Sequence, residues 1–177
     1  MEDKELNPQI KYRHLFERVE VPAKTILLNE GEIAKYTYYI EKGCVRIWFN
    51  HQGKDITLNF FFEGDGVSSI ESFREGKPSY YYLETLEPSI IYKIEREKFQ
   101  FIREDSSTFK KKIEEETFKQ LFMYQNLFLS RIRDSAEMRY KELVQNRPEI
   151  VKRIPQHYIA TYLGITSVSL SRIRKNL

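Results

Sequence analysis

The side chains best suited to chemistry lie near the C-terminal end, on one side of a short amphipathic segment. At about 100° per residue, Leu170, Ile173 and Leu177 fall on one helical stripe. The opposite side of that helix carries small residues and cations, namely Val168, Ser171, Arg172 and Lys175. A slim, positive helix face can enter the major groove of DNA, because bulk would block entry and phosphates attract the cations. This face therefore predicts a recognition helix.

Each of these residue types has a definite role at a DNA surface. The guanidinium of Arg172 can bond the edge of a guanine at two points, which makes it the best candidate for reading a base. Ser167, Val168 and Ser171 would set the preference for neighbouring bases. Lys175 would contact a phosphate. The predicted DNA-contacting set is Gln156, His157, Thr166, Ser167, Val168, Ser171, Arg172 and Lys175.

A preceding helix must hold that face outward, and residues 155–165 supply one. Gly164 provides the turn, since a glycine just past a helix adopts positive φ without strain. Thr166 or Ser167 can cap the second helix with a side-chain oxygen. The inward positions of the first helix and the corner are Ile159, Ala160, Leu163 and Ile165. The spacing predicts a helix-turn-helix, and the alternative is an amphipathic helical hairpin that merely ends a small domain.

The charge distribution favours the DNA-binding interpretation. Residues 131–177 hold ten Lys or Arg and four Asp or Glu, a net charge of +6, whereas the whole chain of 177 residues is +3. Residues 1–130 therefore carry the difference, −3. No Asp or Glu follows Val151. A mildly acidic body joined to a basic end is typical of a sensor attached to a nucleic-acid reader.

Catalytic and metal-dependent functions find little support. The histidines His14, His51 and His157 lie in different parts of the chain, whereas a metal-binding β-roll enzyme needs ligands from neighbouring strands. We find no glycine-flanked nucleophilic serine, no phosphate-binding loop and no paired acid and base. The single cysteine, Cys44, excludes an internal disulfide and a four-thiolate iron–sulfur cluster, and its setting predicts a buried strand thiol. We expect no enzyme, no metal and no other cofactor.

The first 18 residues and the apolar runs say little about function. Residues 1–18 predict one or two short helices anchored by Leu6, Ile10, Leu15 and Phe16. No apolar run approaches the length of about 20 residues that spans a bilayer. The start of the chain is too polar for a secretory signal. We therefore expect a cytoplasmic protein with no membrane contact.

Residues 19–94 have the sequence pattern of short antiparallel strands. Apolar residues alternate in Val45, Ile47 and Phe49, as a half-buried strand requires. The glycines at 31, 43, 53 and 64 are 12, 10 and 11 residues apart, which is the rhythm of strands joined by turns. This pattern predicts a compact β-roll or jelly roll.

Residues 106–133 predict one long helix. Asp105, Ser106 and Ser107 offer caps, and no Gly or Pro interrupts the segment. Its second half is apolar on more than one side, so one stripe should pack on the roll and the other on a second copy of the chain. A symmetric dimer would place two recognition helices about 34 Å apart on a near-palindromic site. The alternative is that a third element of the same chain covers the second stripe.

The order of these parts resembles the Crp-Fnr family of bacterial transcription regulators. The resemblance covers nearly the whole chain and rests on Gly64-Asp65, on Phe73 with Gly76, and on the helix-turn-helix. The stretches RIPQHYIATYLGIT and LSRIRK resemble a branch found in Bacteroidetes-type bacteria. The family implies a cyclic-nucleotide-binding-like sensor at residues 1–105, a dimerisation helix at 106–133 and a DNA-binding domain at 134–177. The expected fold class is α+β: an N-terminal antiparallel β-roll, the long helix and an all-α helix-turn-helix domain.

The chain departs from the family where cyclic AMP would bind. Cyclic-AMP-binding members use a Gly-Glu pair and an Arg-Ser pair, and those places hold Ser68, Ser69, Ser79 and Tyr80 here. A buried phosphate without its guanidinium loses a charge-assisted partner that serine hydroxyls would not replace. We therefore expect no cyclic AMP in the usual pose. Either an unidentified small-molecule effector binds, or none does; the candidate pocket is Ser68, Ser69, Ser79, Tyr80 and Tyr82.

The segments before and within the predicted DNA-binding domain can be assigned as well. Residues 133–137 predict a hinge, residues 136–146 a helix, and PEIVKRI a short turn that leads to Pro155. An Arg and a Glu stand in the cyclic-AMP-responsive members where Ser167 and Val168 lie here, so the DNA sequence read should differ. The partners expected are double-stranded DNA and a second copy of the chain. The alternative function is a ligand-binding roll that signals through protein partners without DNA.

Overall fold

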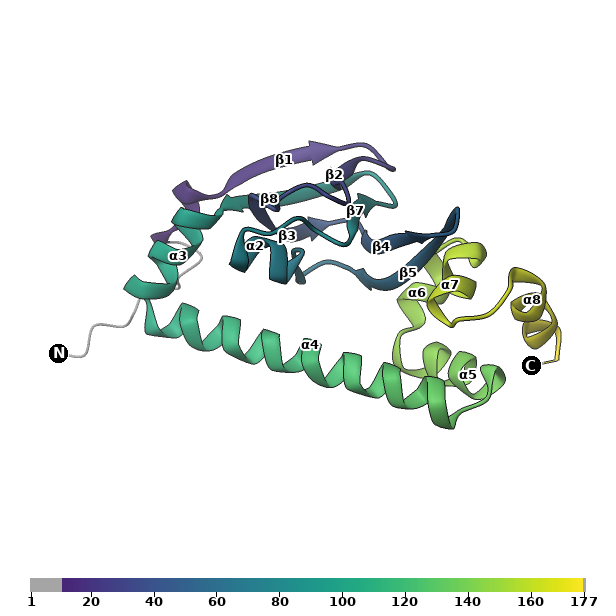
Figure 1. Ribbon diagram of the computed structural model, residues 1–177. Helices are drawn as coiled ribbons and strands as arrows, with labels where there is room; N and C mark the ends of the chain where they lie inside the picture. Colours follow the sequence, from purple (N-terminus) through teal and green to yellow (C-terminus); the bar gives the residue numbers. More distant parts are fainter. Residues whose placement is uncertain (1–10, 177) are drawn as a thin grey trace.

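The computed structural model describes residues 11–176 and shows a β-roll, a long helix beneath it and a group of short helices at its far end (Figure 1). The strands are β1 (Glu17–Val21), β2 (Ile26–Leu28), β3 (Tyr36–Lys42), β4 (Val45–His51), β5 (Lys54–Phe61), β6 (Gly66–Val67), β7 (Tyr82–Thr85) and β8 (Ser89–Glu95). The helices are the 3-10 turn η1 (Arg13–Leu15), α2 (Ile70–Glu75), α3 (Arg96–Asp105), α4 (Ser107–Arg133), α5 (Ala136–Asn146), α6 (Pro148–Arg153), α7 (Gln156–Tyr162) and α8 (Ser167–Lys175). We call β1 to β8 with α2 the roll, and α5 to α8 the reader.

The roll consists of two four-stranded sheets, ordered β1-β8-β3-β6 and β2-β7-β4-β5, with every pairing antiparallel. Their inner faces enclose a buried core that includes Ile40, Val45, Ile47, Leu83 and Ile91. Burial of this apolar surface is the main force that holds the two sheets together. The predicted antiparallel β-roll is confirmed, as is the α+β class with helices segregated after the sheets.

Glycines act where the roll turns sharply. The β4–β5 hairpin closes with His51 paired to Lys54, and its two loop residues, Gln52 and Gly53, have φ of 52° and 79°. Positive φ at both loop positions is the turn whose twist matches antiparallel strands. At Gly43, φ is 110° and an added Cβ would clash with Ser89. Both positions explain why glycine recurs at strand ends in this sequence.

Helix α4 lies along the roll and is capped by one of the three predicted residues. The Ser106 hydroxyl accepts a hydrogen bond from the Phe109 N–H at 3.2 Å. Two hydrogen bonds join the middle of the helix to the roll: the Asn59 side chain donates to the Met123 sulfur, and the Gln120 side chain donates to the Gly66 carbonyl. Burial raises the pKa of the Tyr124 hydroxyl, on the same side, to about 12.

One expectation for local structure needs correction, and another is tested only in part. The sequence predicts one or two short helices in residues 1–18; the described part of this stretch contains the short 3-10 turn η1 and enters strand β1 at Glu17, and Leu6 and Ile10 lie outside the described residues. The predicted turn before Pro155 is instead helix α6. Pro148 begins that helix, where its missing N–H has no partner to lose and its fixed φ already suits a helix.

The reader docks against the roll of the same chain. One buried apolar cluster combines roll residues Cys44, Phe60 and Phe62 with nine buried reader residues, Ile159 and Leu170 among them. Rings of Phe60 and Tyr162 lie 5.4 Å apart between centroids. Figure 1 shows α7 beside the end of β5. The core of the reader is therefore continuous with the outer surface of the roll.

Arginines reinforce this docking. Arg153 of α6 pairs with Glu63 at 2.8 Å and also contacts Glu87. The Arg153 guanidinium holds the pKa of Glu63 at about 2, below the usual 4.5. Arg147 donates to the Asn59 side chain and to the Phe60 carbonyl, each at 2.9 Å. These bonds cross from the reader to the roll.

Candidate nucleic-acid interface and effector pocket

Helices α7 and α8 form the helix-turn-helix that the spacing predicts. Gly164 sits between them with φ of 68°, and its N–H donates to the Thr161 carbonyl at 3.0 Å. The Thr166 hydroxyl then accepts from the Ser169 N–H at 3.1 Å and caps α8. Of the two predicted caps, Thr166 is the one used. Its hydroxyl is therefore occupied by the helix and less available to DNA than the sequence suggests.

The inner side of the motif is closely packed. Ile159, Ala160 and Leu163 are buried, and Leu170 is fully buried at 0% exposed. Ile173 is partly buried against the same cluster, and Leu177 lies outside the described residues. Because α8 has only nine residues, these contacts rather than intrinsic helix stability hold it in place.

The outer side of α8 faces solvent. Val168 is 62% exposed, and Ser167, Ser171, Arg172 and Lys175 are exposed as well. Gln156 and His157, at the start of α7, are also exposed. Among residues 11–176, no acidic side chain pairs with Arg172 or Lys175. The arrangement presents two unpaired cations and small side chains on one surface, which is suited to a groove lined by phosphates.

Several cations counted in the basic end of the chain serve the structure instead. Arg131 donates to the Tyr162 carbonyl, and Arg139 donates to the carbonyls of Asp134 and Leu163. These two arginines satisfy carbonyls at helix ends, and Arg147 and Arg153 bind the roll. The net charge of residues 131–177 therefore overstates the positive charge that is free to meet a ligand.

The predicted effector pocket does not assemble as a unit. Ser69 and Ser79 are both buried, and their hydroxyl oxygens lie 2.9 Å apart. The Ser79 hydroxyl also bonds the backbone of Tyr81, both N–H and carbonyl. The two serines therefore satisfy each other and the adjacent backbone.

The tyrosines of that predicted pocket point elsewhere. Tyr80 is 68% exposed. Tyr82 stacks on Trp48 with ring centroids 4.1 Å apart, on the opposite face of the sheet from the buried Leu83, because neighbouring strand residues alternate. The structure thus does not bring Tyr80 and Tyr82 together with the paired serines, and a role of these residues in binding an effector stays a prediction. Ser68 is half-buried beside Ser69.

Within residues 11–176, no three His, Cys, Asp or Glu side chains gather closely enough to hold a metal ion. No helix in the described part of the chain has the length and hydropathy to cross a membrane. Cys44 is buried, as the sequence predicts, and burial raises the pKa of its thiol to about 12, so the thiolate is strongly disfavoured.

Comparison with known proteins places this architecture among proteins that carry a cyclic nucleotide-binding domain, since the model of that domain matches residues 18–106, half of the chain. The chain is 35% identical over 57 residues to the cAMP-activated global transcriptional regulator CRP of Salmonella typhimurium, a segment that spans 32% of this chain and 27% of that relative. The solved structure of FixK2 from Bradyrhizobium japonicum is similar with a TM-score of 0.76 at 18% identity, covering 92% of this chain and 84% of the other. That of the c-di-GMP responsive global regulator CLP from Xanthomonas campestris has a TM-score of 0.73 at 19% identity, covering 95% and 89%.

The chain therefore belongs to the family of cyclic nucleotide-binding domain proteins, and it shares its fold with FixK2 and CLP; together these findings support the resemblance to the Crp-Fnr family. CRP and CLP are both named as regulators, and neither is named as an enzyme. The Bacteroidetes-type branch stays a prediction.

Proposed function

We propose that the chain is a sequence-specific, DNA-binding transcription regulator that acts as a dimer. The observation that carries the proposal is the outer side of α8, where Arg172 and Lys175 are exposed and unpaired while Leu170 on the inner side is fully buried. Docking of α8 in a major groove would place cations beside phosphates and small side chains beside base edges. The 1–105 segment would act as sensor, 106–133 as dimerisation helix and 134–177 as DNA-binding domain.

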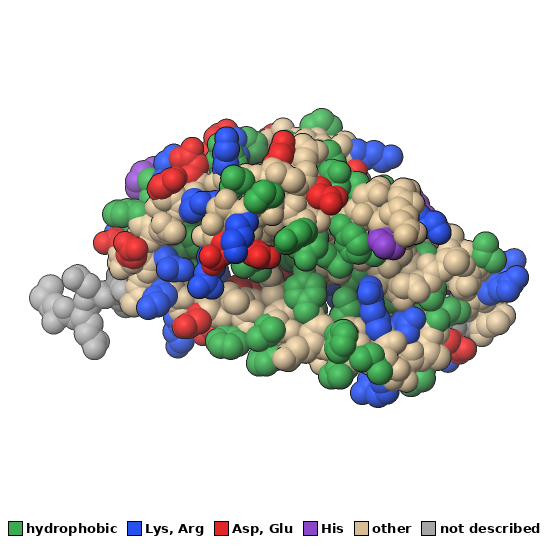
Figure 2. Space-filling model, in the orientation of Figure 1, with side chains coloured by type: hydrophobic (Ala, Val, Ile, Leu, Met, Phe, Trp, Pro, Cys, Tyr) green, Lys and Arg blue, Asp and Glu red, His purple; other side chains and the backbone are tan. Residues whose placement is uncertain are grey.

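A stripe of exposed apolar side chains on α4 supports the dimer. At about 100° per residue its members fall within about 120° of arc. They are between 47% and 71% exposed: Phe118, Leu121, Phe122, Phe128, Leu129 and Ile132. The opposite side of the helix faces the roll of the same chain, and Figure 2 shows hydrophobic side chains along the free edge of α4. A second copy packed on this stripe would remove a patch that monomers rarely expose.

The second part of the proposal concerns the ligand of the roll. Ser69 and Ser79 bond each other where cyclic-AMP-binding members of the family place a Glu and an Arg, so cyclic AMP in the usual pose lacks its charged partner. The CLP protein is described as c-di-GMP responsive, so a roll of this kind is not restricted to one ligand. We propose that this roll responds to a ligand other than cyclic AMP. The alternative is that the bonded Ser69 and Ser79 leave the roll without a ligand, so that the regulator acts constitutively.

The DNA-binding proposal is tested by selecting bound sequences from a random duplex pool and comparing two arginine variants. Arg172→Ala should lose about 1 to 3 kcal/mol on the selected site and relax one base preference. Arg174→Ala is the matched control, since Arg174 is exposed on the same helix but lies roughly 160° from Arg172. It should change affinity for selected and random DNA alike.

Two outcomes would count against this proposal. If wild-type protein enriches no sequence and is not retained on DNA in a salt-dependent way, the DNA-binding function fails. If Arg172→Ala and Arg174→Ala lose the same affinity on selected and random duplexes, Arg172 is a phosphate contact and not a base reader.

A further inference from the structure

A buried arginine lies between the roll and the reader. Arg46, on β4, is only 1% exposed. It points to the outer face of its sheet, opposite Val45 and Ile47, which fill the core. Directly across the strand pairs, Trp48 faces Tyr82 and Arg46 faces Glu84. This outer face of the sheet is the surface on which α7 lies.

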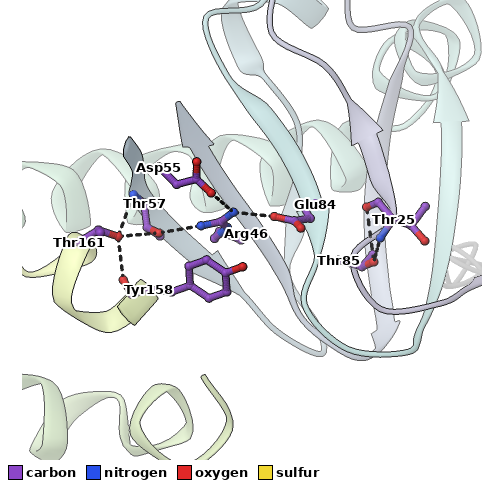
Figure 3. A network of polar contacts seen from close by, with 8 residues as sticks. All are labelled: Thr25, Arg46, Asp55, Thr57, Glu84, Thr85, Tyr158 and Thr161. Atoms are coloured by element: carbon purple, nitrogen blue, oxygen red, sulfur yellow. Dashed lines mark hydrogen bonds and ion pairs between the residues drawn. The ribbon is translucent and has the colours of Figure 1, made fainter. Parts of the chain in front are cut away.

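The Arg46 guanidinium is held by roll residues on its edge. It bonds Glu84 at 2.6 Å and Asp55 at 3.3 Å (Figure 3). Glu84 is itself buried at 7% exposed, so the pair is a buried, charge-assisted contact. Breaking such a pair is costly because one charge stays buried without a partner. Both members of the pair belong to the roll.

Two aromatic rings pack against the same guanidinium. Its central carbon lies 4.7 Å from the Trp48 ring centroid and 3.9 Å from that of Tyr158. Trp48 is a roll residue, but Tyr158 belongs to α7 of the reader. A flat guanidinium packed against two rings is a contact that arginine makes better than lysine. The Arg46 Nε atom is buried without a hydrogen-bond partner.

A second contact in the same layer joins α7 to the edge of the sheet. Strand β5 is the last strand of its sheet, so its outward backbone groups need partners. The Thr57 N–H donates to the Thr161 hydroxyl at 3.3 Å, and the Thr57 and Thr161 hydroxyl oxygens lie 3.1 Å apart. Thr161 follows Tyr158 by three residues, so both side chains lie on one side of α7. Figure 3 shows them directed at Arg46 and Thr57.

These contacts have an orienting role that the apolar cluster lacks. Apolar burial is non-directional, so the shared cluster alone would allow α7 to slide or rotate on the roll. A guanidinium stacked on one ring, together with a hydrogen bond to one backbone N–H, fixes both the rotation and the register of α7. Because α7 and α8 share a buried core, fixing α7 also fixes the direction in which α8 faces.

We propose that Arg46 is a positioning residue for DNA binding, which orients the reader on the roll through Tyr158 and Thr161. This inference rests on the proposed function. In a dimer built on α4, the roll-docked reader sets the separation of the two α8 helices, and therefore the half-site spacing that the protein accepts. The docked arrangement leaves Arg172, Lys175 and Val168 exposed, as DNA binding by α8 requires.

The test compares two ways of removing the stacked contact. Tyr158→Ala leaves the Arg46–Glu84 pair of the roll intact, and Tyr158→Phe keeps the ring and should behave as wild type. Arg46→Lys keeps a charge beside Glu84 but packs less well against the two rings. Arg18→Ala is the control on the roll, since Arg18 also bonds two carboxylates, Glu20 and Glu41, but on the other sheet and away from the reader.

The first measurement needs no DNA. Native-state hydrogen exchange at the Thr57 amide should accelerate about tenfold in Tyr158→Ala and Arg46→Lys, because the reader opens more often. Exchange in strands β3 and β8 should not change, which shows that the roll is still folded. Unchanged Thr57 exchange in both variants, or equal acceleration in Arg18→Ala, overturns the positioning role whether or not the protein binds DNA.

The second measurement uses the DNA sequence selected by the wild-type protein. Inserting about 5 base pairs, half a helical turn, between the half-sites should cost the wild-type dimer about 100-fold in affinity. Tyr158→Ala and Arg46→Lys should bind the original site about tenfold more weakly and lose less than about tenfold on insertion. A purely structural role predicts equal weakening on every spacing, and that result would overturn the proposal. Absence of any selected sequence overturns the DNA-binding function instead, and Thr57 exchange still decides the role of Arg46.

Discussion

Replacing Leu170 with alanine tests whether α8 is held by its inner side. Leu170 is 0% exposed and is the one fully buried side chain of this nine-residue helix, with Ile173 only partly buried. Leu→Ala at a fully buried site costs about 2 to 5 kcal/mol, the larger values applying where the cavity cannot collapse. A helix this short does not persist without its packing, so most of the loss should appear as detachment of α8.

The assay combines urea unfolding with hydrogen exchange of α8 amides. In Leu170→Ala, the α8 amides should exchange at close to the unfolded rate while those of β3 and β8 stay protected. Val168→Ala is the control on the same helix; Val168 is 62% exposed, so its loss should stay within about 0.5 kcal/mol. If Leu170→Ala costs less than about 1 kcal/mol and leaves α8 protected, then α8 is not anchored by that side and the recognition face is assigned incorrectly.

Three further predictions follow from the other contacts. Leu129→Asp should convert a dimer to monomers in sedimentation equilibrium, because Leu129 lies in the apolar stripe of α4. Asn126→Asp adds the same charge at an exposed position off that stripe and should leave the dimer intact. Equal effects of the two variants would show that α4 is not the dimer interface. Arg153 lowers the pKa of Glu63 from 4.5 to about 2, so their ion pair stabilises docking above about pH 4.5 and is lost as the pH falls toward 2. Because the pair is partly exposed, its contribution to stability should be below about 1 kcal/mol. Glu63→Gln should abolish this pH dependence in a series of melting temperatures. With a thiol pKa raised by burial to about 12, Cys44 should react with a thiol reagent at pH 8 only at the rate of unfolding, and rapid labelling of native protein would contradict its place in the shared core.

Local patterns in the sequence were sufficient for the elements that depend on near neighbours. The helix-turn-helix follows from Gly164, a capping threonine and apolar residues at helical spacing, all within a few residues of each other. The β4–β5 hairpin follows from alternation around a turn at Gly53, and α4 follows from a cap at Ser106 and an uninterrupted helical stretch. In each case the deciding interactions span one or two turns of chain.

The tertiary structure alone decided how distant faces meet. Arg46 reads in the sequence as one polar residue in an alternating strand, yet its environment is made by Glu84, Tyr158 and Trp48, two of which lie far along the chain. Likewise, Arg153 contributes to a basic stretch in the sequence but is bound to carboxylates of the roll. A side chain's periodicity shows which face of an element it occupies. Which other element covers that face depends on long-range packing, and here that packing buries Arg46 beneath α7.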